Sequence, residues 1–156
     1  MNIASGVTIN LLTAGAHTLE ADTGRTITVG SVLTNSGALT KSGDGTVILT
    51  AANDYSGATT ISTGVLQIGN GGSAGTLGTG NVTNHATLRF NRSNTVTAAN
   101  AIGGAGTLIQ AGAGTTVLSG DNTYSGPTLI NSGALQIGDA GATGTLGDGT
   151  GAVTNN

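Results

Sequence analysis

Apolar residues in this chain come in short groups that alternate with polar residues. Each group spans only a few residues and is bounded by Gly, Asn, Ser or Asp, which favour turns. The pattern predicts short β-strands, because successive side chains of a strand point to opposite faces. Strands this short are unstable alone, so many of them must stack together. The clearest groups are residues 7–9, 26–29, 47–49, 66–68 and 88–90.

The chain repeats itself at an offset of 69 residues. Residues 53–57 (Asn-Asp-Tyr-Ser-Gly) match residues 122–126 (Asn-Thr-Tyr-Ser-Gly), and 122 − 53 is 69. Near the C-terminus the offset widens to 71, as 153 − 82 shows for the matching Val-Thr-Asn triplets. A long internal repeat is typical of a solenoid, propeller or array. We predict one β-solenoid domain over residues 1–156, with units at 37–105 and 106–156, and with 1–36 matching the end of a preceding unit.

The apolar residues within one unit fall into three columns, and the steps in each column sum to the 69-residue offset. This spacing predicts an all-β fold, a parallel β-helix with three strands per coil, three coils per unit and about six coils in total. We expect a right-handed coil, since parallel crossovers are nearly always right-handed. The columns are Leu33–Ile61–Val82–Ile102, Leu39–Leu66–Leu88–Leu108 and Val47–Leu77–Val96–Thr116, extended backward to Leu12, Leu19 and Ile27 and forward to Ile130, Leu135 and Leu146.

Composition agrees with narrow, stacked coils. Gly, Thr, Ala and Asn fill 91 of the 156 positions, while only 7% of residues are charged and 2% are aromatic. Gly and Asn suit tight corners, and Thr suits strands. The absence of Cys excludes disulfides and cysteine-bound metals. A net charge of −3 does not favour nucleic acid, and no apolar run is long enough for a transmembrane helix.

The chain has two tyrosines, one in the longer loop of each unit, and they have two interpretations. Structurally, Asn53 and Asn122 would hydrogen-bond the local backbone, while Tyr55 and Tyr124 would cover the edge of the coil. Functionally, the same four residues would contact a glycan or a protein partner. The structural interpretation is favoured because the motif recurs with the period of the fold. Phe90, the single Phe, is expected to pack in the interior or at an interface.

Residues 43–69 resemble the autotransporter-associated β-strand repeat, also called the passenger-associated transport repeat. The resemblance rests on Gly43-Asp44-Gly45-Thr46-Val47-Ile48-Leu49-Thr50, on residues 53–61, and on Gly64-Val65-Leu66-Gln67-Ile68-Gly69. Residues 112–138 match equally well. The resemblance implies a structural stalk in a secreted or surface-exposed passenger of a Gram-negative bacterium. Family members carry an export signal and a C-terminal membrane domain, so we expect either an excised stretch of a longer chain or a short relative.

No arrangement of residues predicts catalysis. The acidic residues fall mostly at turns, and none forms the paired carboxylates that a hydrolase needs. We therefore expect no enzyme activity and no cofactor; calcium at the Gly-Asp-Gly runs of Asp44 and Asp148 stays a weak alternative. The predicted function is a rigid spacer or fibre segment that stacks end to end with itself or with adjoining coils. An adhesin module that binds a cell-surface glycan or protein is the alternative.

Overall fold

The computed structural model describes residues 2–3, 8–10, 16–139 and 144–156. These residues form strands and turns and contain no helix, so none that could cross a membrane. Leu12, which the column assignment included, lies outside the described residues. The strands are β1 (Asn2–Ile3), β2 (Thr8–Asn10), β3 (Ala16–Glu20), β4 (Thr26–Val29), β5 (Val32–Thr34), β6 (Ala38–Ser42), β7 (Thr46–Leu49), β8 (Thr59–Ile61), β9 (Val65–Ile68), β10 (Val82–Asn84), β11 (Thr87–Phe90), β12 (Val96–Ala98), β13 (Ile102–Gly103), β14 (Thr107–Gln110), β15 (Thr115–Leu118), β16 (Thr128–Ile130), β17 (Ala134–Ile137) and β18 (Val153–Asn155).

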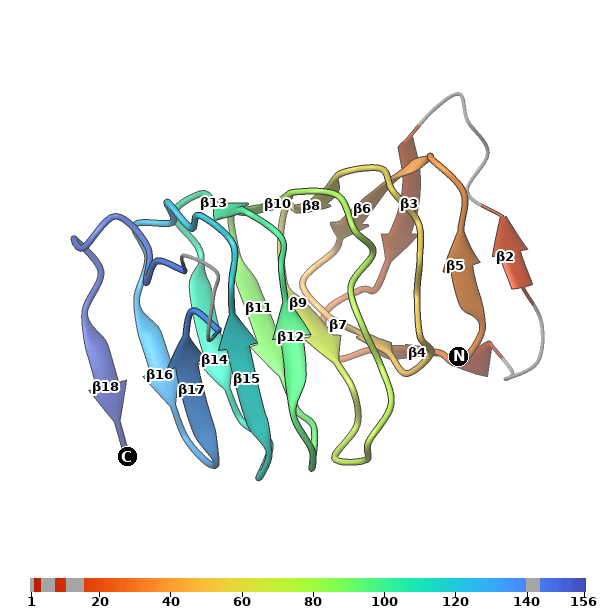
Figure 1. Cartoon of the computed structure of the whole chain (residues 1–156). Helices are drawn as coiled ribbons and strands as arrows, with labels where there is room; N and C mark the ends of the chain where they lie inside the picture. Colours follow the sequence, from red (N-terminus) through yellow and green to blue (C-terminus); the bar gives the residue numbers. More distant parts are fainter. Residues whose placement is uncertain (1, 4–7, 11–15, 140–143) are drawn as a thin grey trace.

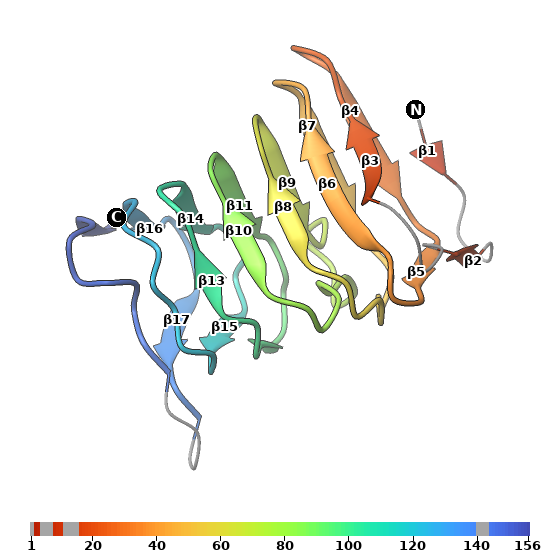
Figure 2. The same cartoon turned by 90° about the horizontal axis from the view of Figure 1, so that it is seen from above.

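The strands wind into a parallel β-solenoid of about six turns, which confirms the predicted fold class (Figures 1 and 2). The first face is an eight-stranded sheet in the order β1-β4-β7-β9-β11-β14-β16-β18. The second face carries the five-stranded sheet β13-β10-β8-β6-β3. The third face carries the short sheets β2-β5 and β12-β15-β17. The strand pairs of the described residues are all parallel, so each coil supplies the hydrogen-bonding edge for the next.

Columns of branched apolar side chains fill the interior. On the first face Leu66, Leu88 and Leu108 pair in register in successive coils, and each is 0% exposed. Burying a Leu side chain contributes about 1.5–3 kcal/mol, so this column stabilises the contact between coils. Phe90 is 1% exposed, which confirms its predicted interior position. The core therefore depends on stacking between coils rather than on any single strand.

The predicted columns are correct only in part. The pairs Val82–Ile102, Val96–Thr116 and Ile27–Val47 are observed, as is the Leu66–Leu88–Leu108 run. Several assignments were wrong. Leu39 pairs with Thr59, Val47 with Leu66, and Ile61 with Asn84. Further along, Ile130 pairs with Gln110, and Leu135 with Thr116. Leu19 pairs with Lys41 rather than Leu39, and Leu33 with Ile9.

One sequence repeat is longer than three coils. Starting from Leu39, three coil steps on the second face pass through Thr59 and Val82 and reach Ile102, which is 63 residues on (102 − 39). The repeat equivalent of Leu39 is Leu108, which lies on β14 of the first face. Each 69-residue unit therefore spans three coils plus one face. Equivalent residues of successive units consequently lie on different faces, which corrects the predicted three coils per unit.

Candidate functional site

Asn53 and Asn122 connect three successive coils. The Asn53 Oδ1 accepts a hydrogen bond from the Leu33 N–H (2.9 Å), and its Nδ2 donates to the Thr76 carbonyl (2.7 Å). Asn122 repeats both bonds, from the Ile102 N–H (3.0 Å) and to the Thr145 carbonyl (2.7 Å). The predicted local backbone bonding is observed for Asn122, whose Nδ2 also donates to the Gly120 carbonyl (3.0 Å). The other partners of the two amides lie about one coil away on either side. The two amides act as staples between coils.

Tyr55 and Tyr124 lie inside the solenoid. Their exposed fractions are 0% and 2%. The Tyr55 hydroxyl is 2.7 Å from Thr59 Oγ1, and the Tyr124 hydroxyl is 2.8 Å from Thr128 Oγ1. Burial raises the pKa of both phenols, so both stay neutral at physiological pH. The spacing Tyr-x-x-x-Thr, present in both units, was the signal in the sequence for this internal pairing.

The structure does not bring the two motifs together. Tyr55 lies on the third face, where its N–H donates to the Leu33 carbonyl (3.2 Å). Tyr124 lies on the second face, where its N–H donates to the Ile102 carbonyl (3.2 Å). Neither ring is presented to solvent. Contact of these four residues with a ligand stays a prediction, and their burial does not support it.

We expect Tyr55→Phe and Tyr124→Phe to destabilise the protein by similar amounts. Each change removes one buried hydroxyl and leaves the hydroxyl of a buried Thr without its partner, which costs about 1–2 kcal/mol. Urea denaturation followed by circular dichroism measures the loss. A value near zero for both variants would show that these hydroxyl pairs do not stabilise the coils.

Sequence reasoning missed a second set of buried polar staples. Lys41 is 0% exposed, and its Nζ donates to the carbonyls of Ser42, Gly43 and Thr63 at 2.8, 2.6 and 3.0 Å. Burial lowers the pKa of Lys41, while the nearby Asp44 raises it. Gln110, one repeat later, is 1% exposed and donates to the carbonyls of residues 112 and 114 at 2.7 and 3.1 Å. The alignment of Lys41 with Gln110 at the 69-residue offset was the signal in the sequence that both side chains fill the same buried role.

Lys41→Gln should be tolerated, because Gln110 makes equivalent hydrogen bonds to corner carbonyls without carrying a charge. Lys41→Leu should lose about 1–3 kcal/mol, since it removes the donor and leaves corner carbonyls without a partner. Thermal melting of both variants tests the difference. Equal melting temperatures would contradict a hydrogen-bonding role for this side chain.

The acidic residues, which were expected at turns, and the two histidines form no metal-binding cluster in the described part of the chain. Among the described residues, no three His, Cys, Asp or Glu side chains are close enough together to hold a metal ion. The Asp148 Oδ1 accepts bonds from the Thr150 N–H (2.9 Å) and hydroxyl (2.6 Å), which lowers the pKa of this carboxyl. The Asp44 carboxylate lies 3.5 Å from the Thr23 hydroxyl. Calcium binding at Asp44 or Asp148 stays untested.

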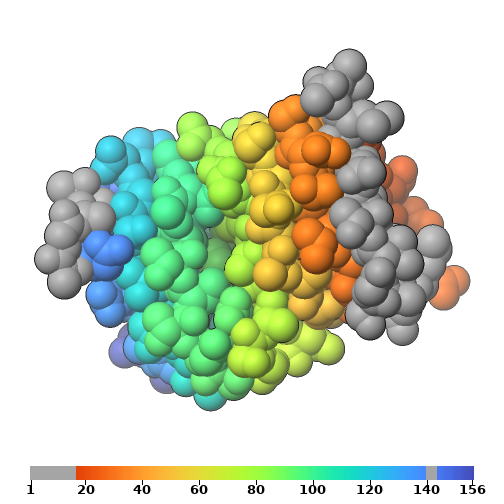
Figure 3. All heavy atoms as spheres, turned by 45° about the vertical axis from the view of Figure 1, so that its right-hand side comes forward, coloured from red at the N-terminus to blue at the C-terminus, as the bar shows by residue number. Residues whose placement is uncertain are grey.

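The surface is hollowed on the third face, beside Asn53. Residues 76–79 and β12 lie on opposite sides of this groove, whose volume is about 280 Å³. Figure 3 shows the surface dipping between the yellow-green and green coils. Phe90 and Leu77, both at least nine-tenths buried, contribute apolar surface to its lining. Asn53, which the sequence suggested as a contact for a glycan or a protein partner, therefore lies beside a cavity.

A family profile matches two segments of the chain. The passenger-associated transport repeat matches residues 39–68 and again residues 108–137, with starts 69 residues apart (108 − 39). The chain carries two copies of the passenger-associated transport repeat. The resemblance seen in the sequence is thereby confirmed. The first copy runs from Leu39 on β6 to Ile68 on β9, and the second runs from Leu108 on β14 to Ile137 on β17.

A curated relative agrees with this result. The adhesin BmaC autotransporter of Brucella suis biovar 1 (strain 1330) is 40% identical over 172 residues, which cover 93% of this chain. The chain spans only 5% of the length of that relative. No solved structure matches the chain. The similarity therefore covers a short segment of that much longer relative.

Proposed function

We propose that this chain is a rigid spacer segment of a passenger displayed on the outer surface of, or secreted by, a Gram-negative bacterium. The proposal rests mainly on the eight-stranded parallel sheet, which runs through the whole described rod. Its coils are joined by backbone ladders, by apolar columns and by buried side-chain staples such as Asn53 and Lys41. The passenger repeat and the adhesin relative support the surface location. The proposed role is non-enzymatic.

The spacer role has a direct geometric test. A chain carrying one additional 69-residue unit should be longer by about 16 Å, because each of its three and a third coils rises about 4.8 Å. Small-angle X-ray scattering measures the maximum dimension of both chains. An unchanged maximum dimension, with the added unit folded to one side, would contradict the spacer.

End-to-end association is part of the proposal. Among the described strands, β17 and β18 are the last of their sheets, so each has one edge without a described neighbouring strand. Beside these edges, Val153 and Ile137 are 54% and 40% exposed, unlike the interior columns. Open edges with apolar side chains favour pairing with a further coil. A second copy of the chain would supply such a coil.

We expect Val153→Lys to weaken this association. A charge at the terminal strand opposes docking of another apolar edge. Light scattering over a concentration series should give a rising mean mass for the wild type and a flatter curve for the variant. Thr83→Lys, an exposed change on β10 away from the end, is the matched control. A strictly monomeric wild type at high concentration would overturn self-association.

A glycan-binding or protein-binding adhesin module is the second proposal. It is supported by the name of the relative, which is an adhesin. The buried positions of Tyr55 and Tyr124 leave Asp54 and Ser56 as the exposed residues of the first motif. Glycan-array binding that is lost in Asp54→Arg but kept in Asp121→Arg would support a site at this motif. Equal binding by both variants would exclude it.

A further inference from the structure

The groove on the third face follows a break between two coils. β12 is the first strand of the sheet β12-β15-β17, so it pairs with β15 on one side only. The Ala98 carbonyl accepts a bond from the Ser119 N–H (3.1 Å), which orients Ala98 toward β15. In a parallel ladder the next residue points the other way, so the N–H and C=O of Thr97 face the groove. Residues 76–79 of the preceding coil lie across the groove and form no strand.

Both ends of the groove are closed by buried polar side chains. At one end the Asn100 Nδ2 donates to the carbonyls of Gly78 (2.9 Å) and Gly80 (2.6 Å). At the other end the Arg92 Nη1 donates to the Gly75 carbonyl (2.6 Å). These hydrogen bonds link the two coils on either side of the groove. An extended peptide strand could not run through such a closed space, so the geometry favours a compact ligand entering from outside.

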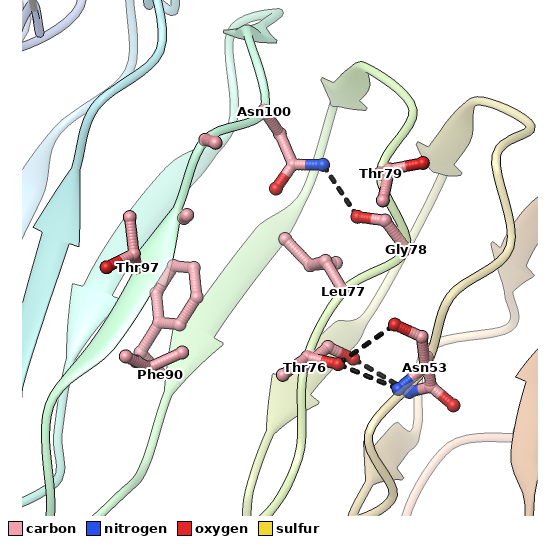
Figure 4. A pocket seen from close by; sticks show the side chains of 11 residues that line it. Asn53, Thr76, Leu77, Gly78, Thr79, Phe90, Thr97 and Asn100 are labelled. Carbon is pink, nitrogen blue, oxygen red and sulfur yellow. Dashed lines mark hydrogen bonds between the residues drawn. The ribbon is translucent and has the colours of Figure 1, made fainter. Parts of the chain in front are cut away.

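Asn100 leaves an acceptor without a partner in this groove. Its side chain is 6% exposed, and two carbonyl acceptors fix which amide atom is the nitrogen. No described residue donates a hydrogen bond to the remaining Oδ1. Figure 4 shows this oxygen turned away from Gly78, toward the space beside Leu77. The oxygen is open to the groove, and a hydrogen bond donated to it by a ligand contributes about 1 kcal/mol net.

The lining selects the chemical class of the ligand. None of the eleven residues that line the groove is charged, and the guanidinium of Arg92 at its end already donates to the carbonyls of Gly75 and Ser73 and to Asn94 Oδ1. The lining therefore disfavours an ionic ligand, because no free charge compensates its loss of water. Phe90, Leu77 and Val96 supply an apolar wall, while Thr97, Thr79 and Asn100 supply hydroxyls and an amide. The volume of about 280 Å³ suits a single small ring rather than a polymer. A neutral sugar unit combines one apolar face with a rim of hydroxyl donors.

We propose that the groove between residues 76–79 and β12 binds one neutral sugar unit. A sugar hydroxyl donates to Asn100 Oδ1, the edge of the ring bonds the free peptide groups of Thr97, and its apolar face contacts Leu77. The site is separate from the tyrosine motifs and does not depend on the spacer role.

The test uses the whole chain labelled with nitrogen-15 and titrated with glucose, galactose, mannose and N-acetylglucosamine. At least one should shift the amide signals of residues 77–79 and 97–100, leaving distant coils unchanged. Glucuronate, the charged counterpart, should bind at least about tenfold more weakly. The proposal is overturned if no neutral sugar shifts these signals, or if glucuronate binds as well.

Thr97→Arg places a long side chain at the exposed mouth of the groove and should weaken binding at least about tenfold. Thr83→Arg puts the same side chain on an exposed position of β10 and should leave binding unchanged. The unchanged dispersion of the remaining amide signals verifies the fold of both variants. Equal binding by the two variants would place the sugar elsewhere and refute the site.

Discussion

Gly64→Ala should unfold the protein or cost it more than about 4 kcal/mol, a loss well above that of most single substitutions. Gly64 has φ +68°, and a Cβ there would lie 2.4 Å from the Gly45 carbonyl oxygen and 2.5 Å from that of Gly43. It would also lie 2.7 Å from Lys41 Nζ. These atoms belong to the preceding coil and to its buried staple, so relief requires neighbouring coils to separate. Denaturation in urea, followed by circular dichroism, measures the effect.

Gly71→Ala is the matched control for backbone strain. Gly71 has φ +79°, but a Cβ there would meet nothing within 4 Å. Only the cost of the left-handed conformation remains, about 1–2 kcal/mol. The difference between the two variants isolates the close approach of stacked coils. If both lost the same amount, tight coil stacking at Gly64 would be disproved.

Phe90→Ala should cost about 3–5 kcal/mol, the usual loss for a buried Phe. Phe90 is 1% exposed and pairs in register with Ile68 and Gln110, so truncation opens a cavity between three coils. The cavity would extend the groove, because Phe90 lines it. Thermal and urea denaturation both report the loss.

Phe90→Leu separates volume from aromatic character. It keeps most of the apolar volume and should cost about 1.5 kcal/mol. Ala21, the repeat equivalent of Phe90, is also buried, but it follows β3 on the second face, so its surroundings differ from those of Phe90. A cost for Phe90→Ala below that of Phe90→Leu would mean that the local coil collapses around the truncated side chain.

The fold class was accessible from the sequence because strand pattern, repeat and turn residues agree. Leu66, Leu88 and Leu108 were placed correctly, since nearly regular spacing and matching surroundings identify them as one column. The assignment failed for Leu39, Val47 and Ile61. The number of residues at a corner varies from coil to coil, and apolar spacing alone does not reveal which face a strand joins. A repeat that includes one extra face then resembles three whole coils.

The candidate site was less accessible. The recurrence of Asn53 and Tyr55 at Asn122 and Tyr124 indicated a structural motif, and the structure gives these residues partners inside the rod. Lys41 was missed because a charged residue is expected at the surface unless its partners are known. The groove at β12 depends on a missing strand pair, which no local pattern encodes.

Disulfide formation between Thr40→Cys and Thr60→Cys is the most direct test of the coil arrangement, since the chain has no cysteine of its own. Thr40 pairs with Thr60 on the second face, and neighbouring parallel strands are about 4.8 Å apart, within reach of a disulfide. Stacking of Leu39 on Leu66 would instead place Thr40 beside Gln67. We predict rapid intramolecular oxidation of the Thr40/Thr60 double variant and none of the Thr40→Cys/Gln67→Cys variant. The opposite result would contradict a repeat that advances by three coils and one face.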